Sequence, residues 1–186
     1  MNKYRLPTET IIAGKTVPFK SDFRDILYIF EILNDPDLLD HERILLAAEN
    51  FYETEDYKED IDTAISDMME FIRGGTDDSH SNTSKKPLYD WDQDYDIIVA
   101  PINRVVGKDI RGLEYFHWWT FISAFMEIGE STFSTFVSIR DKKSRGVKFE
   151  KWEERLYKEN KDRINLNKKV DSTTQSIMDE IMGKGV

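Results

Sequence analysis

Carboxylates alternate with other residues in the stretch DWDQDYD, residues 90–96, which places four aspartates within seven positions. Alternating oxygen ligands are the donor set of a calcium-binding loop. That loop also needs glycine at its sixth position and glutamate at its twelfth, where this stretch has Tyr95 and Pro101. Acidic side chains at a helix start are favoured by the positive end of the helix dipole. The sequence therefore favours a helix start, and no metal site is predicted.

Other sequence motifs of catalytic or ligand-binding sites are incomplete in this chain. The GKT at residues 14–16 lacks the first glycine of a phosphate-binding loop, because Glu9 stands at that position. The histidines, His41, His80 and His117, are too far apart in sequence for a zinc or metalloprotease motif. No nucleophile elbow is present, and the carboxylates form no selected acid and base pair. The sequence predicts no catalytic or cofactor site and a protein that is not an enzyme.

Aromatic side chains gather in YFHWWTF, residues 115–121. On a helix from about Leu113 to Ile128, one narrow stripe is polar and the rest is apolar, which is typical of a buried helix. His117 lies on the polar stripe, where we expect a hydrogen bond at the core edge. Large aromatic rings are mostly hidden from water, yet an exposed face of Trp118 or Trp119 would form a groove for a partner's apolar helix. Both interpretations stay open.

The composition limits the class of protein. The 186 residues include 33% charged residues, 39% hydrophobic residues and no cysteine, with a net charge of −10. Disulfides and thiol catalysis are excluded, and nucleic-acid binding is disfavoured because it needs clustered lysine and arginine. No stretch has the length of a membrane span or of the apolar region of a signal peptide. We expect a soluble cytosolic protein with one core.

The first elements follow from apolar spacing. Two β-prone runs in TIIAGKTVPF, residues 10–19, flank a Gly-Lys turn and predict a hairpin. A helix over residues 23–33 follows a Ser21 cap. The next helix is predicted to begin with Asp35 as its cap and Pro36 at its first position. Its expected core positions are Leu38, Leu39, Leu45, Leu46 and Ala48.

The later elements are also predicted from apolar spacing and from residues that end helices. A third helix, with its apolar stripe in residues 61–72, is predicted to end at the two glycines that follow. Residues 74–87 contain no large apolar side chain and predict a flexible loop. Helical spacing then runs through residues 91–107, although Pro101 is expected to kink or interrupt that helix. A short helix in STFSTFVSIR precedes a charged helix over residues 149–169. The expected anchors of the charged helix are Phe149, Trp152 and Leu156.

These elements together predict a mainly α fold. We expect a single helical domain of about six or seven helices at residues 21–169, with a flexible loop at residues 74–87. A short N-terminal β-hairpin at residues 1–20 precedes it. A C-terminal tail at residues 170–186 follows it and includes a short apolar segment that is suited to binding a partner.

Four stretches, taken in order, resemble one protein family. They are GKTVPFKSDFRD, YDWDQDYDIIVAPINRVVGKDIR, LEYFHWWTFISAF and SIRDKKSRGVKFEKWEERLYKENK. The chain resembles small acidic proteins from tailed phages and prophages of Gram-positive bacteria, encoded just ahead of the tape-measure gene and regarded as tail assembly chaperones. The most specific part is the double tryptophan after His117, followed by Ile139 and Arg140.

The resemblance implies a mechanism without bond chemistry. A tape-measure protein is a long, largely helical, apolar chain that must stay soluble until tail-tube subunits polymerise around it. Many copies of an acidic chaperone would cover it and then be displaced by those subunits. Such a chaperone acts in the host cytoplasm and is not expected in the mature virion. The tail-tube protein and a second copy of this chain are further candidate partners.

Residues for partner binding come from the aromatic stretch, from the Ile139-Arg140 part of the resemblance, from the charged helix and from the tail. The candidates are Trp118, Trp119, Tyr115, Arg140, Trp152, Ile177 and Ile181.

Charge alone supports a different class, an acidic inhibitor or DNA mimic that occupies a basic groove on a host enzyme. Such a protein would spread carboxylates over one face, whereas residues 140–163 mix both signs. An enzyme of unknown type is the third alternative, and its first sign would be a deep pocket with converging polar side chains. No cofactor, nucleic-acid or membrane partner is expected.

Overall fold

A computed structural model describes residues 5–75 and 88–167 of the chain. In these residues eight α-helices and two short 3₁₀ helices follow a two-stranded antiparallel hairpin. The predicted fold class, mainly α with an N-terminal β-hairpin, is confirmed. The predicted loop at residues 74–87, apart from its first two residues, and the predicted tail at residues 170–186 lie outside the described part.

The hairpin consists of β1 (Glu9–Ile12) and β2 (Lys15–Pro18). Ala13 and Gly14 between them have φ values of 49° and 79°. Two successive positive φ angles are typical of a type I′ turn, whose twist matches that of the flanking strands. The hairpin is therefore confirmed, but its turn is Ala13-Gly14 rather than Gly14-Lys15.

Helix α1 (Phe23–Leu33) matches the predicted residues, but its cap is Asp22 rather than Ser21. One carboxylate oxygen of Asp22 accepts from the backbone N–H of Arg24 at 3.0 Å, and the other accepts from the N–H of Phe116 at 2.8 Å. The hydroxyl of Ser21 instead shares a hydrogen bond with that of Tyr115. The cap thus also joins α1 to the segment before α5.

Helix α2 (Asp40–Phe51) begins four residues later than predicted. The carboxylate of Asp35 accepts from the N–H of Asp37 at 2.9 Å, so the Asp-Pro pair forms a turn instead of a helix start. The prediction that the leucines of this helix face the core is also wrong. Three of them are exposed, while Ala47, Ala48 and Phe51 are buried. Small side chains let α1 and α2 approach closely, so the alanine face packs inward. The exposed leucines are Leu39, Leu45 and Leu46.

The 3₁₀ helix η1 (Glu55–Asp60) leads into α3 (Ile61–Ile72), which ends as predicted at two glycines with positive φ. Helix α4 (Tyr95–Val106) runs unbroken through Pro101 and ends at Gly107. The expected interruption at Pro101 is therefore wrong. The proline removes one backbone donor, but the buried face of α4 still packs on α5 and the core.

The 3₁₀ helix η2 (Ile110–Gly112) precedes α5 (Trp118–Met126), which is shorter than the predicted helix of residues 113–128. Helix α6 (Thr132–Ser144) follows a Ser131 cap. The predicted charged helix of residues 149–169 is divided into α7 (Lys151–Glu159) and α8 (Lys161–Ile164). The break lies at Asn160, whose backbone angles are not helical.

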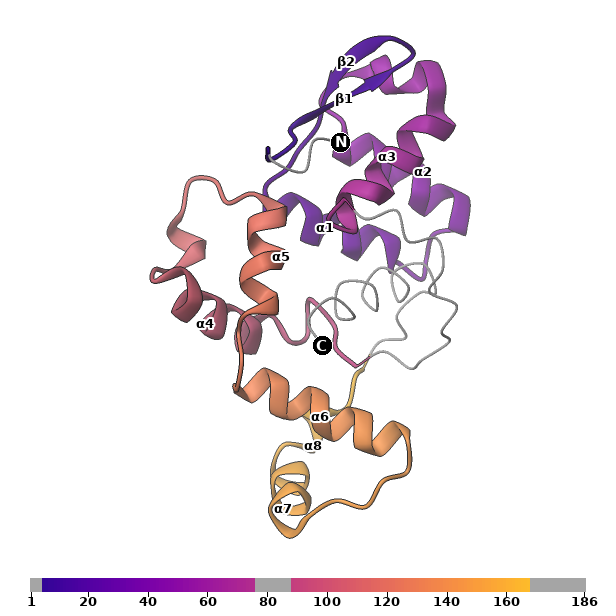
Figure 1. The fold of residues 1–186 in the computed structure, drawn as a ribbon. Coiled ribbons are helices and arrows are strands. Elements are labelled where there is room, and N and C mark those ends of the chain that lie inside the picture. Colours follow the sequence, from indigo (N-terminus) through magenta and orange to yellow (C-terminus); the bar gives the residue numbers. More distant parts are fainter. Residues whose placement is uncertain (1–4, 76–87, 168–186) are drawn as a thin grey trace.

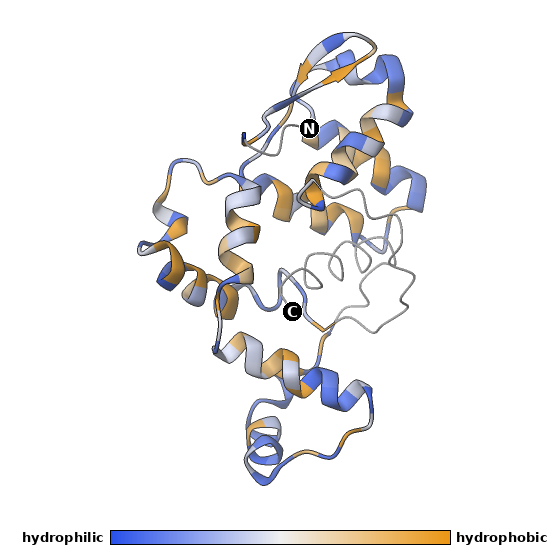
Figure 2. Cartoon of the chain, in the orientation of Figure 1, coloured by the Kyte–Doolittle hydropathy of each residue, from blue (hydrophilic) through white to orange (hydrophobic). Residues whose placement is uncertain are grey.

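The elements form an elongated arrangement (Figure 1). The hairpin, α2 and α3 lie at one end, α4 and α5 flank the middle, and α6–α8 form the other end. One hydrophobic cluster unites the hairpin with α1–α5, and a smaller one joins Phe136, Ile139 and Ile164 between α6 and α8. Figure 2 shows that α7 is mainly hydrophilic. No helix in the described residues is both long and apolar enough to cross a membrane.

Candidate interaction groove

The double tryptophan joins two helices. Trp118 is fully buried, and its indole N–H donates to the carbonyl of Ile72 at 2.8 Å. Trp119 is partly buried, and its indole N–H donates to the carbonyl of Phe71 at 2.8 Å. The last carbonyls of a helix have no partner within the helix. The two indoles supply partners at the end of α3, so Trp118 leaves no surface for another protein.

The position of Trp119 explains why residue 75 is a glycine. A Cβ atom on Gly75 would lie 2.7 Å from Cη2 of Trp119, and the φ of Gly75 is +74°. The indole also stacks on Phe71, with ring centroids 5.7 Å apart. Trp119 is therefore held between its helix and the end of α3, and only part of the ring is open to a partner.

His117 is the cap of α5. Its Nδ1 accepts from the N–H of Trp119 at 3.0 Å, so its Nε2 carries the proton and donates to the carbonyl of Pro7 at 2.9 Å. Burial lowers the pKa of His117. The expected hydrogen bond of this histidine is confirmed. Tyr115, two residues earlier, is 51% exposed and contacts Ser21 through its hydroxyl.

Arg140 is part of a buried ion pair. Its guanidinium forms two hydrogen bonds with the carboxylate of Asp94, at 2.5 and 2.9 Å. It also donates to three backbone carbonyls, so all five of its N–H groups are used. Only 6% of the Arg140 side chain and 2% of the Asp94 side chain are exposed. Arg140 therefore holds α4, α6 and α8 together and has no donor left for a partner. The three carbonyls are those of Leu88, Arg163 and Ile164.

Of the four alternating aspartates, two are buried and two are exposed. Asp90 and Asp94 are buried, and Asp90 accepts from the N–H groups of Asp92 and Gln93 at 3.0 and 2.7 Å. Asp92 and Asp96 are exposed. The stretch thus forms a turn that leads into α4, in agreement with the predicted helix start. In the described residues, no three or more His, Asp or Glu side chains group in a way that could hold a metal ion.

Trp152 does not anchor the charged helix, contrary to prediction. It is 50% exposed, and its indole N–H donates to the carboxylate of Glu150 at 2.9 Å. Glu153 is buried instead and accepts from the ammonium group of Lys142 at 2.5 Å. The remaining candidates, Ile177 and Ile181, lie outside the described residues.

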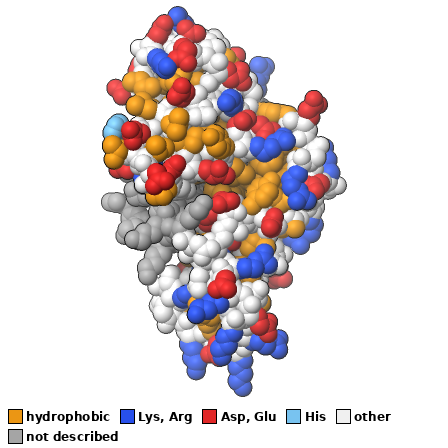
Figure 3. Space-filling view, turned by 180° about the vertical axis from the view of Figure 1, so that it is seen from behind, with side chains coloured by type: hydrophobic (Ala, Val, Ile, Leu, Met, Phe, Trp, Pro, Cys, Tyr) orange, Lys and Arg blue, Asp and Glu red, His pale blue; other side chains and the backbone are white. Residues whose placement is uncertain are grey.

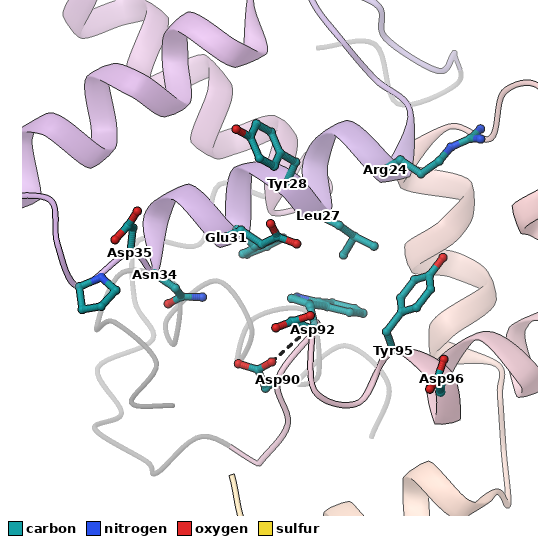
Figure 4. Close-up of a pocket in the computed structure, with 13 residues that line it drawn as sticks. Arg24, Leu27, Tyr28, Glu31, Asn34, Asp35, Asp90, Asp92, Tyr95 and Asp96 are labelled. Carbon is teal, nitrogen blue, oxygen red and sulfur yellow. Dashed lines mark hydrogen bonds between the residues drawn. The ribbon is translucent and has the colours of Figure 1, made fainter. Parts of the chain in front are cut away.

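A groove of about 820 Å³ lies between α1 and the turn at residues 90–96, and sequence reasoning did not identify it. Figure 4 shows Leu27 and Glu31 on α1 facing the segment that carries Asp92 and Tyr95. Its apolar and aromatic lining residues are Leu27, Tyr28, Phe30, Trp91 and Tyr95. Its carboxylates are Glu31, Asp35, Asp90, Asp92 and Asp96.

The charge of the groove is strongly negative. Arg24 is the one basic side chain among the described residues that line it, and its guanidinium is paired with Asp22 at 2.7 and 3.0 Å. Burial raises the pKa of the Tyr95 hydroxyl, so this ring stays neutral at physiological pH. Figure 3, seen from behind, shows apolar side chains among carboxylates over much of the molecule, with lysine and arginine concentrated at the end formed by α6–α8. The groove is suited to a basic, apolar ligand.

Trp91, which lines the groove, has a buried polar atom. Trp91 is 5% exposed and packs against Phe125, with ring centroids 4.9 Å apart. Its indole N–H is buried and has no hydrogen-bond acceptor among the described residues. Leaving such a donor unpaired costs about 1 to 3 kcal/mol.

Comparison with known protein families gives a match over most of the chain. The sequence model of a family described as "Bacteriophage Gp15 protein" matches residues 3–166. No curated protein and no solved structure matches the chain.

Proposed function

The chain belongs to the bacteriophage Gp15 protein family, and on that premise we propose that it is a tail assembly chaperone. In this proposal it binds the phage tape-measure protein and keeps that long chain soluble until tail-tube subunits polymerise. It acts in the cytoplasm of the bacterial host and is not retained in the mature virion.

The observation that carries the proposal is the groove between α1 and residues 90–96. An apolar floor with a rim of carboxylates suits one face of a helix whose apolar residues are flanked by lysine or arginine. Tyr28 is 54% exposed at this site and offers an aromatic surface to such a helix. The net charge of −10 would keep neighbouring copies apart along a coated chain.

When many copies of the chaperone cover one tape-measure chain, each copy needs only a weak contact. Burying about 100 Å² of apolar surface in the groove contributes about 2.5 kcal/mol before the costs of association. Many weak contacts along one long chain still produce firm coverage, because the sites are linked. Tail-tube subunits that bind the same length more tightly then displace the chaperone by mass action.

Co-expression tests the proposal. The protein is produced together with the tape-measure protein of the same phage, and the soluble fraction is assayed for the tape-measure chain and for co-purification. We expect the tape-measure protein to move into the soluble fraction. A tape-measure protein that stays insoluble beside abundant folded partner would contradict the proposal and would favour the acidic inhibitor, which a nuclease competition assay then tests.

Matched variants locate the surface. Tyr28→Ala and Glu31→Lys change exposed groove residues, and we expect each to reduce the soluble tape-measure fraction. Trp152→Ala and Glu154→Lys make equivalent changes on α7, where Trp152 is 50% exposed. If the α7 variants lose activity and the groove variants keep it, the binding surface is α7 and not the groove.

A further inference from the structure

Charge is unevenly distributed along the chain. Residues 5–75, which contain the hairpin and α1–α3, include 17 acidic and seven basic residues. Residues 140–163, which run from the end of α6 through α7, include six acidic and ten basic residues. Figure 3 shows the lysines and arginines gathered at the end formed by α6–α8. The molecule therefore has a basic end and an acidic remainder that contains the groove.

The basic end carries an exposed aromatic side chain. Trp152 on α7 is 50% exposed, and Val147 in the loop before this helix is 44% exposed. Three basic residues lie within four positions of Trp152 in the sequence, and all of them are exposed. They are Lys148, Lys151 and Arg155. This segment therefore presents apolar surface beside basic side chains, which is the ligand chemistry that the groove suits.

The acidic residues near Trp152 are mostly engaged or turned away. The carboxylate of Glu150 accepts from the indole N–H of Trp152 at 2.9 Å. Glu153 is buried and is paired with a lysine of α6 at 2.5 Å. Glu154 follows Trp152 by two residues, so it lies on nearly the opposite side of the helix, and Glu159 lies two turns further on. Positive charge is therefore in excess on the α7 surface around Trp152.

The groove has the opposite charge and enough room. Carboxylates surround its aromatic floor, and Arg24, the basic residue among its described lining residues, is paired with Asp22. Pockets of about 300 to 1,000 Å³ hold a drug-sized ligand, so a groove of about 820 Å³ can take the Trp152 ring together with neighbouring side chains. Figure 1 shows α7 beyond α6, at the end of the molecule away from α1. The α7 that reaches the groove must therefore come from another copy.

We propose that α7 of one copy docks in the groove of a second copy, with Trp152 against the aromatic floor and with Lys151 and Arg155 at the carboxylates. Two different surfaces meet in such a heterologous contact, so it links copies head to tail into an open chain unless the rotation closes a ring. The net charge of −10 opposes other approaches, whereas this one brings opposite charges together. A contact of this small size is weak and depends on protein concentration.

This inference does not depend on the proposed function. A tape-measure helix in the groove would exclude α7 of a second copy, so the two ligands are alternative occupants of one site. Self-association is measured on the purified chain alone, without the tape-measure protein. A failure of this proposal would therefore leave the outcome of the co-expression experiment unaffected.

Complementary variants of the full chain test the contact by sedimentation equilibrium. The groove variant combines Glu31→Lys with Asp92→Lys, and the α7 variant combines Trp152→Ala with Arg155→Glu, all at exposed positions. We expect the native chain to exceed its monomer mass of 21.9 kDa as its concentration rises. Each variant alone should associate about tenfold more weakly or less. An equal mixture of the two should form dimers and nothing larger, because only one intact groove and one intact α7 can meet.

The matched control combines Glu49→Lys with Asp62→Lys, two exposed positions that do not line the groove. It makes the same change in net charge as the groove variant and should associate at least as strongly as the native chain. Native protein that stays monomeric up to about 0.5 mM would overturn the proposal, as would a monomeric mixture of the two variants. Native-like association of either variant alone would show a contact between identical surfaces and would also refute head-to-tail docking.

Discussion

Replacing Arg140 by methionine tests the buried ion pair that joins α4, α6 and α8. The substitution keeps an apolar side chain of similar length and removes all five hydrogen bonds of the guanidinium. It leaves the carboxylate of Asp94 buried without its counter-charge. Removing one partner of a buried pair typically costs about 3 to 5 kcal/mol.

That loss is large beside the total stability of a protein, which is about 5 to 15 kcal/mol. For a chain of this size each kcal/mol lowers the melting temperature by about 2 to 4 °C, so we expect a fall of roughly 10 °C. Urea unfolding followed by tryptophan fluorescence measures the free energy directly, because Trp118 and Trp91 are buried and change environment on unfolding.

The matched control is Arg145→Met. Arg145 pairs with Asp141 at 2.5 Å, four residues away on α6, but its side chain is 62% exposed. Exposed pairs contribute about 0.2 to 1 kcal/mol, so this variant should lose less than about 1 kcal/mol. The double variant Arg140→Met with Asp94→Leu should be more stable than Arg140→Met alone, since it removes the orphaned charge. Equal losses for Arg140→Met and Arg145→Met would refute the structural role of the buried pair.

Two further predictions concern α5 and its surroundings. Gly75→Ala should lower the free energy of unfolding by about 2 kcal/mol, because the φ of Gly75 is positive and the new Cβ atom would displace Trp119. In the control Gly107→Ala the new Cβ atom meets no atom within 4 Å, so only the cost of the positive φ, about 1 kcal/mol, is expected. Equal losses of the two variants in urea unfolding would show that the Trp119 contact does not contribute. Burial lowers the pKa of His117 in the folded state, so the unfolded state binds the proton more readily below about pH 6.5. Stability should therefore fall as the pH decreases from about 6.5 toward the folded pKa, and His117→Asn should flatten this slope in urea unfolding at a series of pH values; an unchanged slope would exclude His117 as its source.

Helix positions were largely predictable from the sequence. The apolar spacing of residues 23–33 and 61–72 predicted α1 and α3, because a helix that packs on a core by one face repeats its apolar residues every three to four positions. Their boundaries were less certain. The hydroxyl of Ser21 and the carboxylate of Asp22 are both good caps in isolation, and the contact with Phe116 decided between them.

It was harder to predict which face of each helix is buried. Leucines and alanines of α2 both qualify as core residues by composition, and the alanine face is buried because α1 lies close against it. The groove was missed for a similar reason. Tyr28 and Glu31 look like an ordinary outward face until the turn at residues 90–96 is placed opposite them.

The sequence by itself determined that this chain folds into helices after a hairpin, carries excess negative charge and has no thiol chemistry, since these properties depend on local spacing and on composition. The tertiary structure alone decided that Arg140 is a buried partner of Asp94, that Trp118 belongs to the core and that an acidic groove faces α1. Contacts between residues 46 positions apart leave no periodic signal in a sequence, because they depend on how the helices are packed together.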